Sequence, residues 1–153
     1  MGRMETPSDR EIVTRRFLDA PRERVFEAFS DPARLARWWG PAGFSSTFHE
    51  FDFRPGGRWR FLLHGPNGAD YPNESVFVEV VKPERIVFDH LSDHWFRMTI
   101  TLTARPASQT LITWHMLFET AAERDRIQAI VVEANEQNLD RLEAELARVR
   151  DKG

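Results

Sequence analysis

The sequence predicts an α+β domain in which one antiparallel sheet packs its apolar face against a long C-terminal helix. Three observations support this fold class. Residues 120–150 contain neither Pro nor Gly and place their apolar side chains on one stripe of a helical wheel. Residues 44–118 alternate between strand-like runs and turn signals. Two short helical segments separate a first strand from these runs. The expected order is therefore one strand, two short helices, a meander of six strands and one long helix.

The first third of the chain supplies the lone strand and the two short helices. Residues 11–19 (EIVTRRFLD) are rich in the Val, Ile, Thr and Phe that favour strands. Ala20-Pro21 opens a helix with Pro at its first position. Asp31-Pro32 begins a second helix, with Asp as the N-cap, and Gly40-Pro41 ends it. Residues 1–10 are polar and expected to be flexible, so a single domain is expected over residues 11–150.

The later strands each carry one apolar face. In residues 95–103, Phe, Met, Ile and Leu alternate with Arg and Thr, which is typical of a half-buried strand. In residues 44–53, Phe occurs at both even and odd positions, so the sequence does not decide which side of that strand faces inward. Because the inward aromatics are bulky, we expect helix and sheet not to touch along their whole length. The sequence therefore predicts a pocket between them, although large side chains can also fill such a space.

The apolar stripe of the long helix is interrupted by two amides. Thr120 and Glu123 have the spacing of a capping box at its start. Asn138 projects at the middle of the stripe and Asn135 at its margin. A buried amide without partners costs roughly 1–3 kcal/mol, so these two bond either a ligand's polar group or a neighbour such as His90 or a backbone carbonyl. The stripe itself consists of Ile127, Ile130, Val131, Ala134, Leu142, Leu146 and Val149.

One further polar group and a Trp pair complete the candidate site. His90 shares the parity of Phe88, which places an ionisable group in an apolar cavity, where desolvation lowers its pKa. It would orient a ligand or transfer a proton. Trp38 and Trp39 either line the cavity mouth or, as the alternative, Trp38 anchors the core and Trp39 packs partly exposed. The expected ligand-binding residues are Trp38, Trp59, Phe61, Phe88, His90, Met98, Trp114, Met116, Ile130, Ala134, Asn135 and Asn138.

Composition and motifs argue against several other classes of protein. A net charge of -3 disfavours nucleic acid as a partner, and no apolar run is long enough to span a membrane. The absence of Cys and of a signal peptide suits a cytoplasmic protein. The five His show no metal-ligand spacing, so neither a metal nor a cofactor is expected. No G-x-S-x-G motif occurs and Ser45-Ser46 has no obvious base, so we assign no catalytic residue.

An ordered set of short motifs resembles a known family. The motifs are AP at 20–21 followed by VF at 25–26, DP at 31–32, WWGP at 38–41, DFRPGGRW at 52–59, GPNG at 65–68, VVKPERIV at 80–87 and LDRL at 139–142. Together, over about residues 11–148, they resemble the START-like (SRPBCC) superfamily, in the branch named after the activator of the heat-shock protein 90 ATPase. The resemblance implies a helix-grip fold, a curved antiparallel sheet around the C-terminal helix with a cavity between them. Many members carry Gly-Trp where this chain has Ala134-Asn135.

Fold class and site residues together lead to one expected function and two alternatives. The leading interpretation is binding of a small hydrophobic or amphipathic molecule between sheet and helix. The first alternative is a polyketide cyclase or dehydratase, for which only His90 is available as the proton-transfer group. The second is an interaction module, either associated with a chaperone or forming a homodimer, which a large exposed apolar patch would favour.

Overall fold

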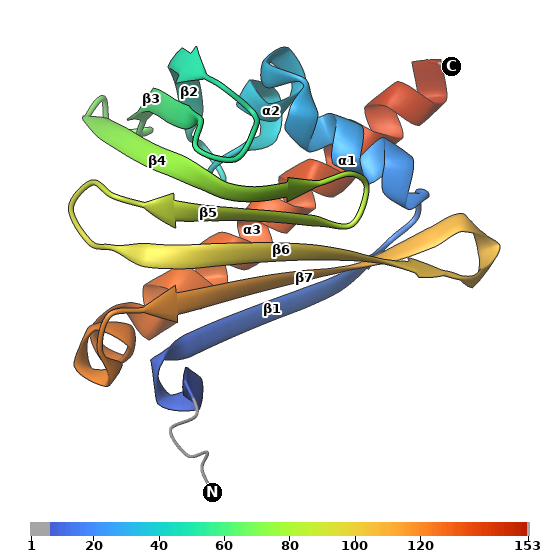
Figure 1. Ribbon diagram of the computed structural model, residues 1–153. Helices are drawn as coiled ribbons and strands as arrows, with labels where there is room; N and C mark the ends of the chain where they lie inside the picture. The colour runs from blue at the N-terminus through green and yellow to red at the C-terminus, as the bar shows by residue number, and fades with distance from the viewer. Residues whose placement is uncertain (1–6, 153) are drawn as a thin grey trace, which may run out of the picture.

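The computed structural model, which describes residues 7–152, contains a seven-stranded antiparallel sheet with its helices on one face (Figure 1). The order of elements agrees with the predicted one, and α+β is confirmed as the fold class. Short 3-10 turns, η1 (Pro7–Arg10) and η2 (Pro106–Ser108), flank the regular elements. These elements are β1 (Glu11–Leu18), α1 (Arg22–Ser30), α2 (Pro32–Trp38), β2 (Ser45–Phe51), β3 (Arg58–His64), β4 (Asp70–Val81), β5 (Arg85–His90), β6 (Phe96–Arg105), β7 (Gln109–Phe118) and α3 (Ala121–Lys152).

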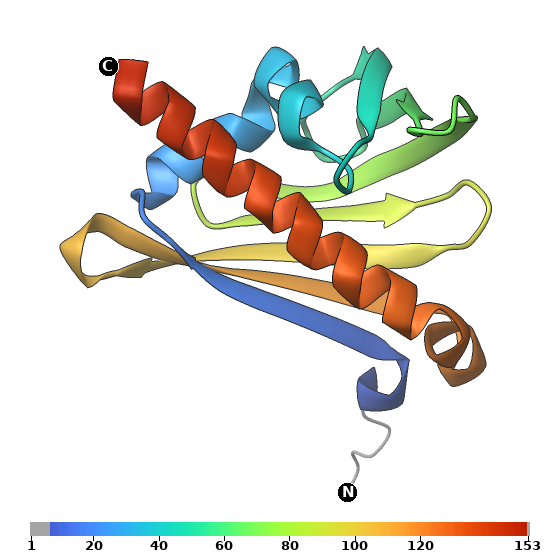
Figure 2. The ribbon, with the colours of Figure 1, turned by 180° about the vertical axis from the view of Figure 1, so that it is seen from behind.

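The strand order explains why the first strand stands apart in the sequence. The sheet runs β1-β7-β6-β5-β4-β3-β2, so β1 pairs with the last strand and lies at the edge opposite β2. The two short helices α1 and α2 connect these edges, and the other strands form a meander. Helix α3 crosses the same face of the sheet diagonally, as Figure 2 shows. This arrangement is the helix-grip architecture.

Side-chain caps fix where the helices begin. The carboxylate of Asp31 accepts a hydrogen bond from the backbone N–H of Ala33 at 3.0 Å, which confirms Asp31 as the N-cap of α2. The Thr120 hydroxyl accepts from the N–H of Glu123 at 3.0 Å, so the predicted start of α3 is also confirmed. Pro21 precedes α1 as its N-cap, one position before the place predicted. Of the expected flexible segment 1–10, residues 7–10 form η1, and residues 1–6 lie outside the described residues.

A β-bulge explains why both parities of residues 44–53 carry Phe. The register between β2 and β3 shifts between Phe48 and Glu50. As a result Phe48 pairs with Phe61, and Phe51, three residues further on, pairs with Trp59. A bulge adds one residue to a strand and so exchanges the parity that faces inward. The aromatic residues on both sides of the bulge therefore lie on the inner face.

The core lies between the inner face of the sheet and the three helices, and α3 joins it unevenly. The positions of α3 that are buried all follow residue 134, whereas residues 121–134 include none. Ile130 was predicted on the apolar stripe that faces the sheet, but it lies at the surface and is 74% exposed. The helical wheel identified the apolar side of the helix but not which part of that side meets a partner. The buried residues of α3 are Asn135, Asn138, Leu139, Leu142, Glu145 and Leu146.

Candidate functional site

Apart from His90, the residues of the sheet that were predicted to contact a ligand lie on its inner face and are buried. Alternation along each strand sets this face, since each of them pairs across to another inward residue. Their rings pack on one another; Trp59, for example, stacks on Phe61 with centroids 4.8 Å apart. They thus form part of the core as well as the wall of any space beneath α3. These residues are Trp59, Phe61, Phe88, Met98, Trp114 and Met116.

The adjacent Trp38 and Trp39 differ in role. Trp38 is 1% exposed, and its indole N–H donates to the carbonyl oxygen of Ala28 at 3.0 Å. It anchors α2 to α1. Trp39 is only partly buried and lies at the centre of the aromatic residues, with its ring 5.0 Å from that of Trp59 and 5.5 Å from that of Trp114. Trp39 therefore covers the middle of the inner face from the loop that follows α2.

The loop that carries Trp39 is attached to α3 by side chains of the helix. Arg141 donates to the carbonyl oxygens of Gly40 at 2.9 Å, Pro41 at 3.0 Å and Arg37 at 2.8 Å. The bonds to Arg37 and Gly40 satisfy carbonyl groups at the end of α2 and in its loop, and the Pro41 carbonyl also accepts from the N–H of Phe44 at 3.1 Å. We call residues 39–44 the tryptophan loop. Its position relative to α3 is set by Arg141, because a guanidinium has several donors in a rigid plane.

The two amides predicted on the stripe are buried, and both have protein partners. The Asn138 oxygen accepts from the backbone N–H of Gly40 at 3.2 Å, so it helps Arg141 to hold the tryptophan loop. The Asn135 amide nitrogen donates to the hydroxyl of Thr14 at 3.2 Å and approaches the sulfur of Met116 at 3.5 Å. In residues 7–152, the Asn138 nitrogen and the Asn135 oxygen have no hydrogen-bond partner. Each amide therefore has one polar atom without a partner among these residues.

His90 lies on the inner face of β5, as its parity predicted. Its Nδ1 is 2.9 Å from the carbonyl oxygen of His94, and its Nε2 is 2.9 Å from the side-chain oxygen of Asn73. The ring stacks on Phe96 with centroids 4.6 Å apart. Burial lowers the pKa of His90, and the bond to the His94 carbonyl only partly opposes this. Both ring nitrogens are thus engaged within the protein, which leaves the cyclase alternative without a free proton-transfer group at this position.

The predicted residues Ile130 and Ala134 meet at a surface hollow. This hollow, which we call the apolar hollow, has a volume of about 360 Å³ and lies between α3 and the tryptophan loop. Pro41 and Phe44 form its other apolar wall, and the Phe44 ring is 6.3 Å from that of Tyr71. Polar groups occur only at Glu133 and Gln137. The tryptophan loop therefore forms one wall of the hollow and, through Trp39, also covers the inner face.

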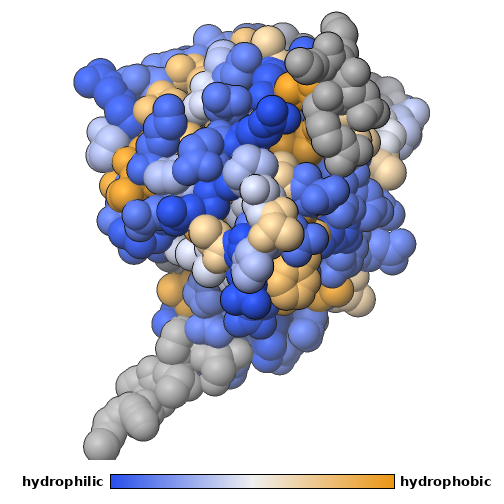
Figure 3. All heavy atoms as spheres, turned by 90° about the vertical axis from the view of Figure 1, so that its right-hand side faces the viewer, coloured by the Kyte–Doolittle hydropathy of each residue, from blue (hydrophilic) through white to orange (hydrophobic). Residues whose placement is uncertain are grey.

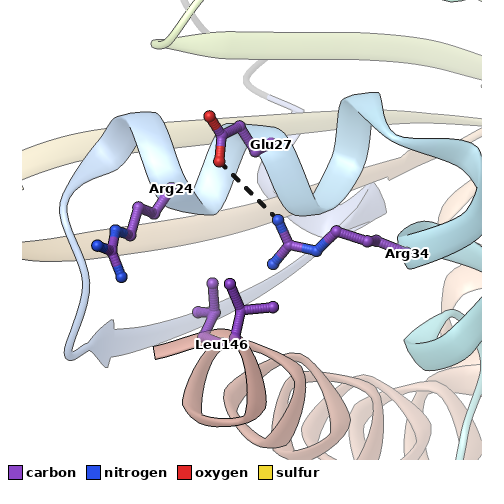
Figure 4. Close-up of a pocket in the computed structure, with 5 residues that line it drawn as sticks. Arg24, Glu27, Arg34 and Leu146 are labelled. Carbon is purple, nitrogen blue, oxygen red and sulfur yellow. Dashed lines mark ion pairs between the residues drawn. The ribbon is translucent and has the colours of Figure 1, made fainter. Parts of the chain in front are cut away.

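A second hollow, about 390 Å³ in volume, has a different chemistry. It lies between α1, α2 and the C-terminal part of α3 (Figure 4), where Arg24, Glu27 and Arg34 surround Leu146 and Val149. The Arg34 guanidinium is 3.9 Å from the Glu27 carboxylate. The surface on the side of the β6–β7 hairpin and the C-terminal end of α3 is mostly hydrophilic, with small separate apolar areas (Figure 3). An apolar ligand therefore fits the first hollow better than this one.

Ion pairs link the C-terminal part of α3 to α2. The Glu145 carboxylate is 4% exposed and accepts hydrogen bonds from Arg34, Arg37 and Arg148 at 2.9 to 3.2 Å. Burial alone raises the pKa of Glu145, but the hydrogen bonds from these three arginines outweigh it and hold the pKa at about 2. Glu145 is therefore ionised near neutral pH and belongs to the helix–helix contact rather than to the apolar hollow.

Metal binding and membrane spanning receive no support in the described part of the chain. No three His, Cys, Asp or Glu side chains within residues 7–152 are grouped so that they could hold a metal ion. None of the helices in this range combines the length and apolarity needed to cross a membrane.

Comparison with known proteins places this chain in a family. Residues 19–147 match the family described as activator of Hsp90 ATPase homolog 1-like protein. The chain belongs to this family. The predicted resemblance to that branch of the START-like superfamily is confirmed. No curated protein matches the chain.

Solved structures agree with the family assignment. A protein from Chromobacterium violaceum is 29% identical, with a TM-score of 0.77 over 88% of this chain and 95% of that one. A protein from Arthrobacter aurescens is 22% identical, with a TM-score of 0.85 over 94% and 89%. An activator-homolog-like protein from Aeromonas hydrophila is 21% identical, with a TM-score of 0.74 over 91% and 93%. The last two matches concern the fold alone.

The residues that the sequence did not identify are those that bond to backbone groups. Arg141 was not singled out, and Gln137, which accepts from the N–H of Ala42 at 3.1 Å, was not either. Their partners are peptide groups about a hundred residues earlier in the chain, which have no signature in side-chain type. The motif WWGP marked the loop itself, but nothing in it indicates which part of α3 holds it.

Proposed function

We propose that this member of the activator of Hsp90 ATPase homolog 1-like family binds a small hydrophobic or amphipathic molecule, which enters at the apolar hollow between α3 and the tryptophan loop. The observation that carries the proposal is Ile130, which is 74% exposed beside Phe44, Pro41 and Ala134 in a hollow of about 360 Å³. Removing apolar surface from water contributes roughly 25 cal/mol per Å². An apolar ligand is therefore the kind of molecule that gains most there.

The interior below the hollow supports the same proposal. Ile127 and Val131 face the core from α3 yet stay only partly buried, as does Trp39 from the tryptophan loop. The indole N–H groups of Trp59 and Trp114 are buried and lack a hydrogen-bond partner within residues 7–152. An unpaired buried donor costs about 1–3 kcal/mol, which a ligand acceptor would offset. A molecule with an apolar body and an uncharged acceptor, such as a carbonyl or ether oxygen, meets both requirements.

The remaining predicted residues would line the path of the ligand from the apolar hollow to the inner face of the sheet. Trp39 rather than Trp38 lies between the apolar hollow and the inner aromatics, because Trp38 is committed to Ala28. The unused amide groups of Asn135 and Asn138 provide one acceptor and one donor at the edge of the inner space. Phe61, Phe88, Met98 and Met116 would supply apolar contact area once Trp39 moves aside.

Two exposed apolar residues of α3 allow a matched test. Ile130 lines the hollow, whereas Val132, which is 40% exposed, does not. We expect Ile130→Asp to weaken binding of the neutral fluorophore N-phenyl-1-naphthylamine at least about tenfold, because it places a charge against the apolar body of the ligand. Val132→Asp should leave the Kd within about twofold. The measurement is a fluorescence titration of both variants and the unaltered chain.

Equal Kd values for Ile130→Asp and Val132→Asp would contradict this location of the site. Native mass spectrometry of the purified chain adds an independent reading, since a bound small molecule appears as a fixed mass increment that Ile130→Asp should remove. The same spectra give the subunit count, which tests the homodimer alternative.

A further inference from the structure

Three side chains on the outer face of the sheet, opposite α3, form a continuous chain of hydrogen bonds. The Thr47 hydroxyl oxygen is 2.7 Å from Nε2 of His64, and Nδ1 of His64 is 2.7 Å from a carboxylate oxygen of Asp70. They come from the neighbouring strands β2, β3 and β4. Since Phe48 and Leu63 face the core, the adjacent Thr47 and His64 face away from it.

The β3–β4 turn fixes the relative position of the imidazole and the carboxylate. His64 and Asp70 are direct partners in the antiparallel register. The Gly65 N–H donates to the carbonyl of Ala69 at 2.8 Å, and the side-chain oxygen of Asn67 accepts from the N–H of Ala69 at 3.0 Å. A Cβ at Gly65 would lie only 2.9 Å from that Asn67 oxygen, so a larger residue there would displace the Asn67 side chain from its bond to Ala69. The pairing of His64 with Asp70 thus follows from backbone geometry.

The order of the three groups determines the tautomer of the imidazole. The Asp70 carboxylate only accepts, so Nδ1 of a neutral His64 carries the hydrogen and donates it. Nε2 then presents its lone pair to the hydroxyl of Thr47, which donates to it. This arrangement of hydroxyl, imidazole and carboxylate is the one by which hydrolases activate a nucleophilic oxygen.

The hydroxyl is also accessible, and the residue paired with Thr47 across the register lines a hollow. Thr47 is exposed, and the side chains of His64 and Asp70 are 33% and 56% exposed. Leu62, the partner of Thr47 across the β2–β3 register, lines a hollow of about 240 Å³ together with Arg60 and Pro72. Leu62 and Pro72 offer a small apolar surface, whereas the Arg60 guanidinium forms an ion pair with Glu50 at 3.3 Å and Glu74 also lines the hollow. A short, uncharged acyl group matches the apolar part of this surface.

We propose that Thr47, His64 and Asp70 hydrolyse esters of short-chain carboxylic acids by acyl transfer. The Thr47 oxygen attacks the ester carbonyl carbon while its proton passes to Nε2 of His64. The bond from that carbon to the alcohol oxygen then breaks, and the leaving oxygen takes the proton from His64. Water attacks the acyl-Thr47 ester with His64 as base, which releases the carboxylic acid and restores the hydroxyl. Asp70 is a positioning residue that holds the imidazole.

The test is hydrolysis of 4-nitrophenyl acetate by the full chain, with variants that keep the exposed surface. We expect Thr47→Val and His64→Gln to lower kcat/KM roughly a hundredfold, the usual contribution of a positioned base. Asp70→Asn should lower it by about tenfold, and Thr47→Ser should retain it. Thr101→Val, on the same outer face but without a histidine bond, is the matched control and should leave the rate unchanged.

A second measurement distinguishes catalysis from a structural role. Quenched reactions, digested and analysed by mass spectrometry, should carry the acetyl group on Thr47, or on the serine of Thr47→Ser. An unaltered rate in Thr47→Val, or an acetyl group located only on other residues, would overturn the proposal. Ile130→Asp should not alter this activity, so this result is independent of ligand binding at the apolar hollow.

Discussion

The two halves of α3 have similar apolar content but are attached to the domain in different ways. Within residues 121–149, all the buried positions belong to residues 135–149, which pack on α1, α2 and β1. Residues 121–134 contain four Ile and Val residues, yet none of these is buried. Burial along the helix is therefore decided by the partners opposite it rather than by its own hydrophobicity. The loosely covered half is the one next to the apolar hollow.

Hydrogen bonds and ion pairs also differ between the two halves of α3. In the C-terminal half, Arg141 holds the tryptophan loop and Glu145 binds three arginines. In the N-terminal half the polar contacts of Glu123 lie near the start of the helix. Its carboxylate forms an ion pair with His94 at 2.9 Å, and its backbone N–H donates to the Thr120 hydroxyl. A helix fixed firmly at one end and lightly at the other leaves its light end free to adjust to a ligand.

The largest effect should come from truncating the two halves in parallel. Leu142 is fully buried, so Leu142→Ala should destabilise the fold by about 2–5 kcal/mol through lost burial and a cavity. Ile130→Ala, in the other half, should stay within roughly 0.5 kcal/mol of the unaltered chain. Urea denaturation followed by Trp fluorescence gives both free energies of unfolding. Similar losses of unfolding free energy in the two variants would contradict the view that the two halves of α3 are attached differently.

The second effect is a pH dependence confined to the C-terminal half. The pKa of Glu145 is lowered from 4.5 to about 2 in the folded state, so its stabilisation is complete above the unfolded value and is lost as the pH falls between the two. This corresponds to on the order of 3 kcal/mol. Relative to the unaltered chain, Glu145→Gln should be less stable near pH 7, and the difference should vanish near pH 2.

The pH prediction is checked by denaturation curves for both proteins across that range. Glu123→Gln is the matched control from the other half of α3. If the unaltered chain and Glu145→Gln kept a constant difference at every pH, the three-arginine contact would not be the source of the stability.

The smallest effect concerns the start of α3. Thr120→Ala removes the hydroxyl that accepts from the N–H of Glu123, which should cost about 1 kcal/mol. Amide hydrogen exchange should report the loss locally, with faster exchange in residues 123–130 and unchanged exchange in residues 139–149. Acceleration spread evenly over the whole helix would mean that its two halves open together.

The sequence was sufficient for the fold because its strongest signals are local. The caps at Asp31 and Thr120, the turn at residues 65–68 and the alternation in β6 each depend on neighbours a few residues apart. The parity of β2 could not be decided, because a bulge is visible only in the register with β3. Ile130 was placed on the apolar stripe that faces the sheet because a helical wheel contains no information about the elements opposite it.

The site was harder to predict because its chemistry joins distant parts of the chain. His90 was placed on the correct face by parity, but its bonds to Asn73 and to the His94 carbonyl depend on the path of the β5–β6 loop. Thr47 and His64 are 17 residues apart and meet only across two strands. A search for a base close to Ser45-Ser46 in sequence therefore missed the neighbouring hydroxyl that has one.

The bonds of Arg141 also have a bearing on the order of folding. The carbonyls that it binds at Arg37, Gly40 and Pro41 lie 100 to 104 residues earlier. During synthesis the tryptophan loop thus leaves the ribosome well before the guanidinium that holds it exists. The tryptophan loop can therefore be fixed in its final position only after the part of α3 that carries Asn138 and Arg141 has been synthesised.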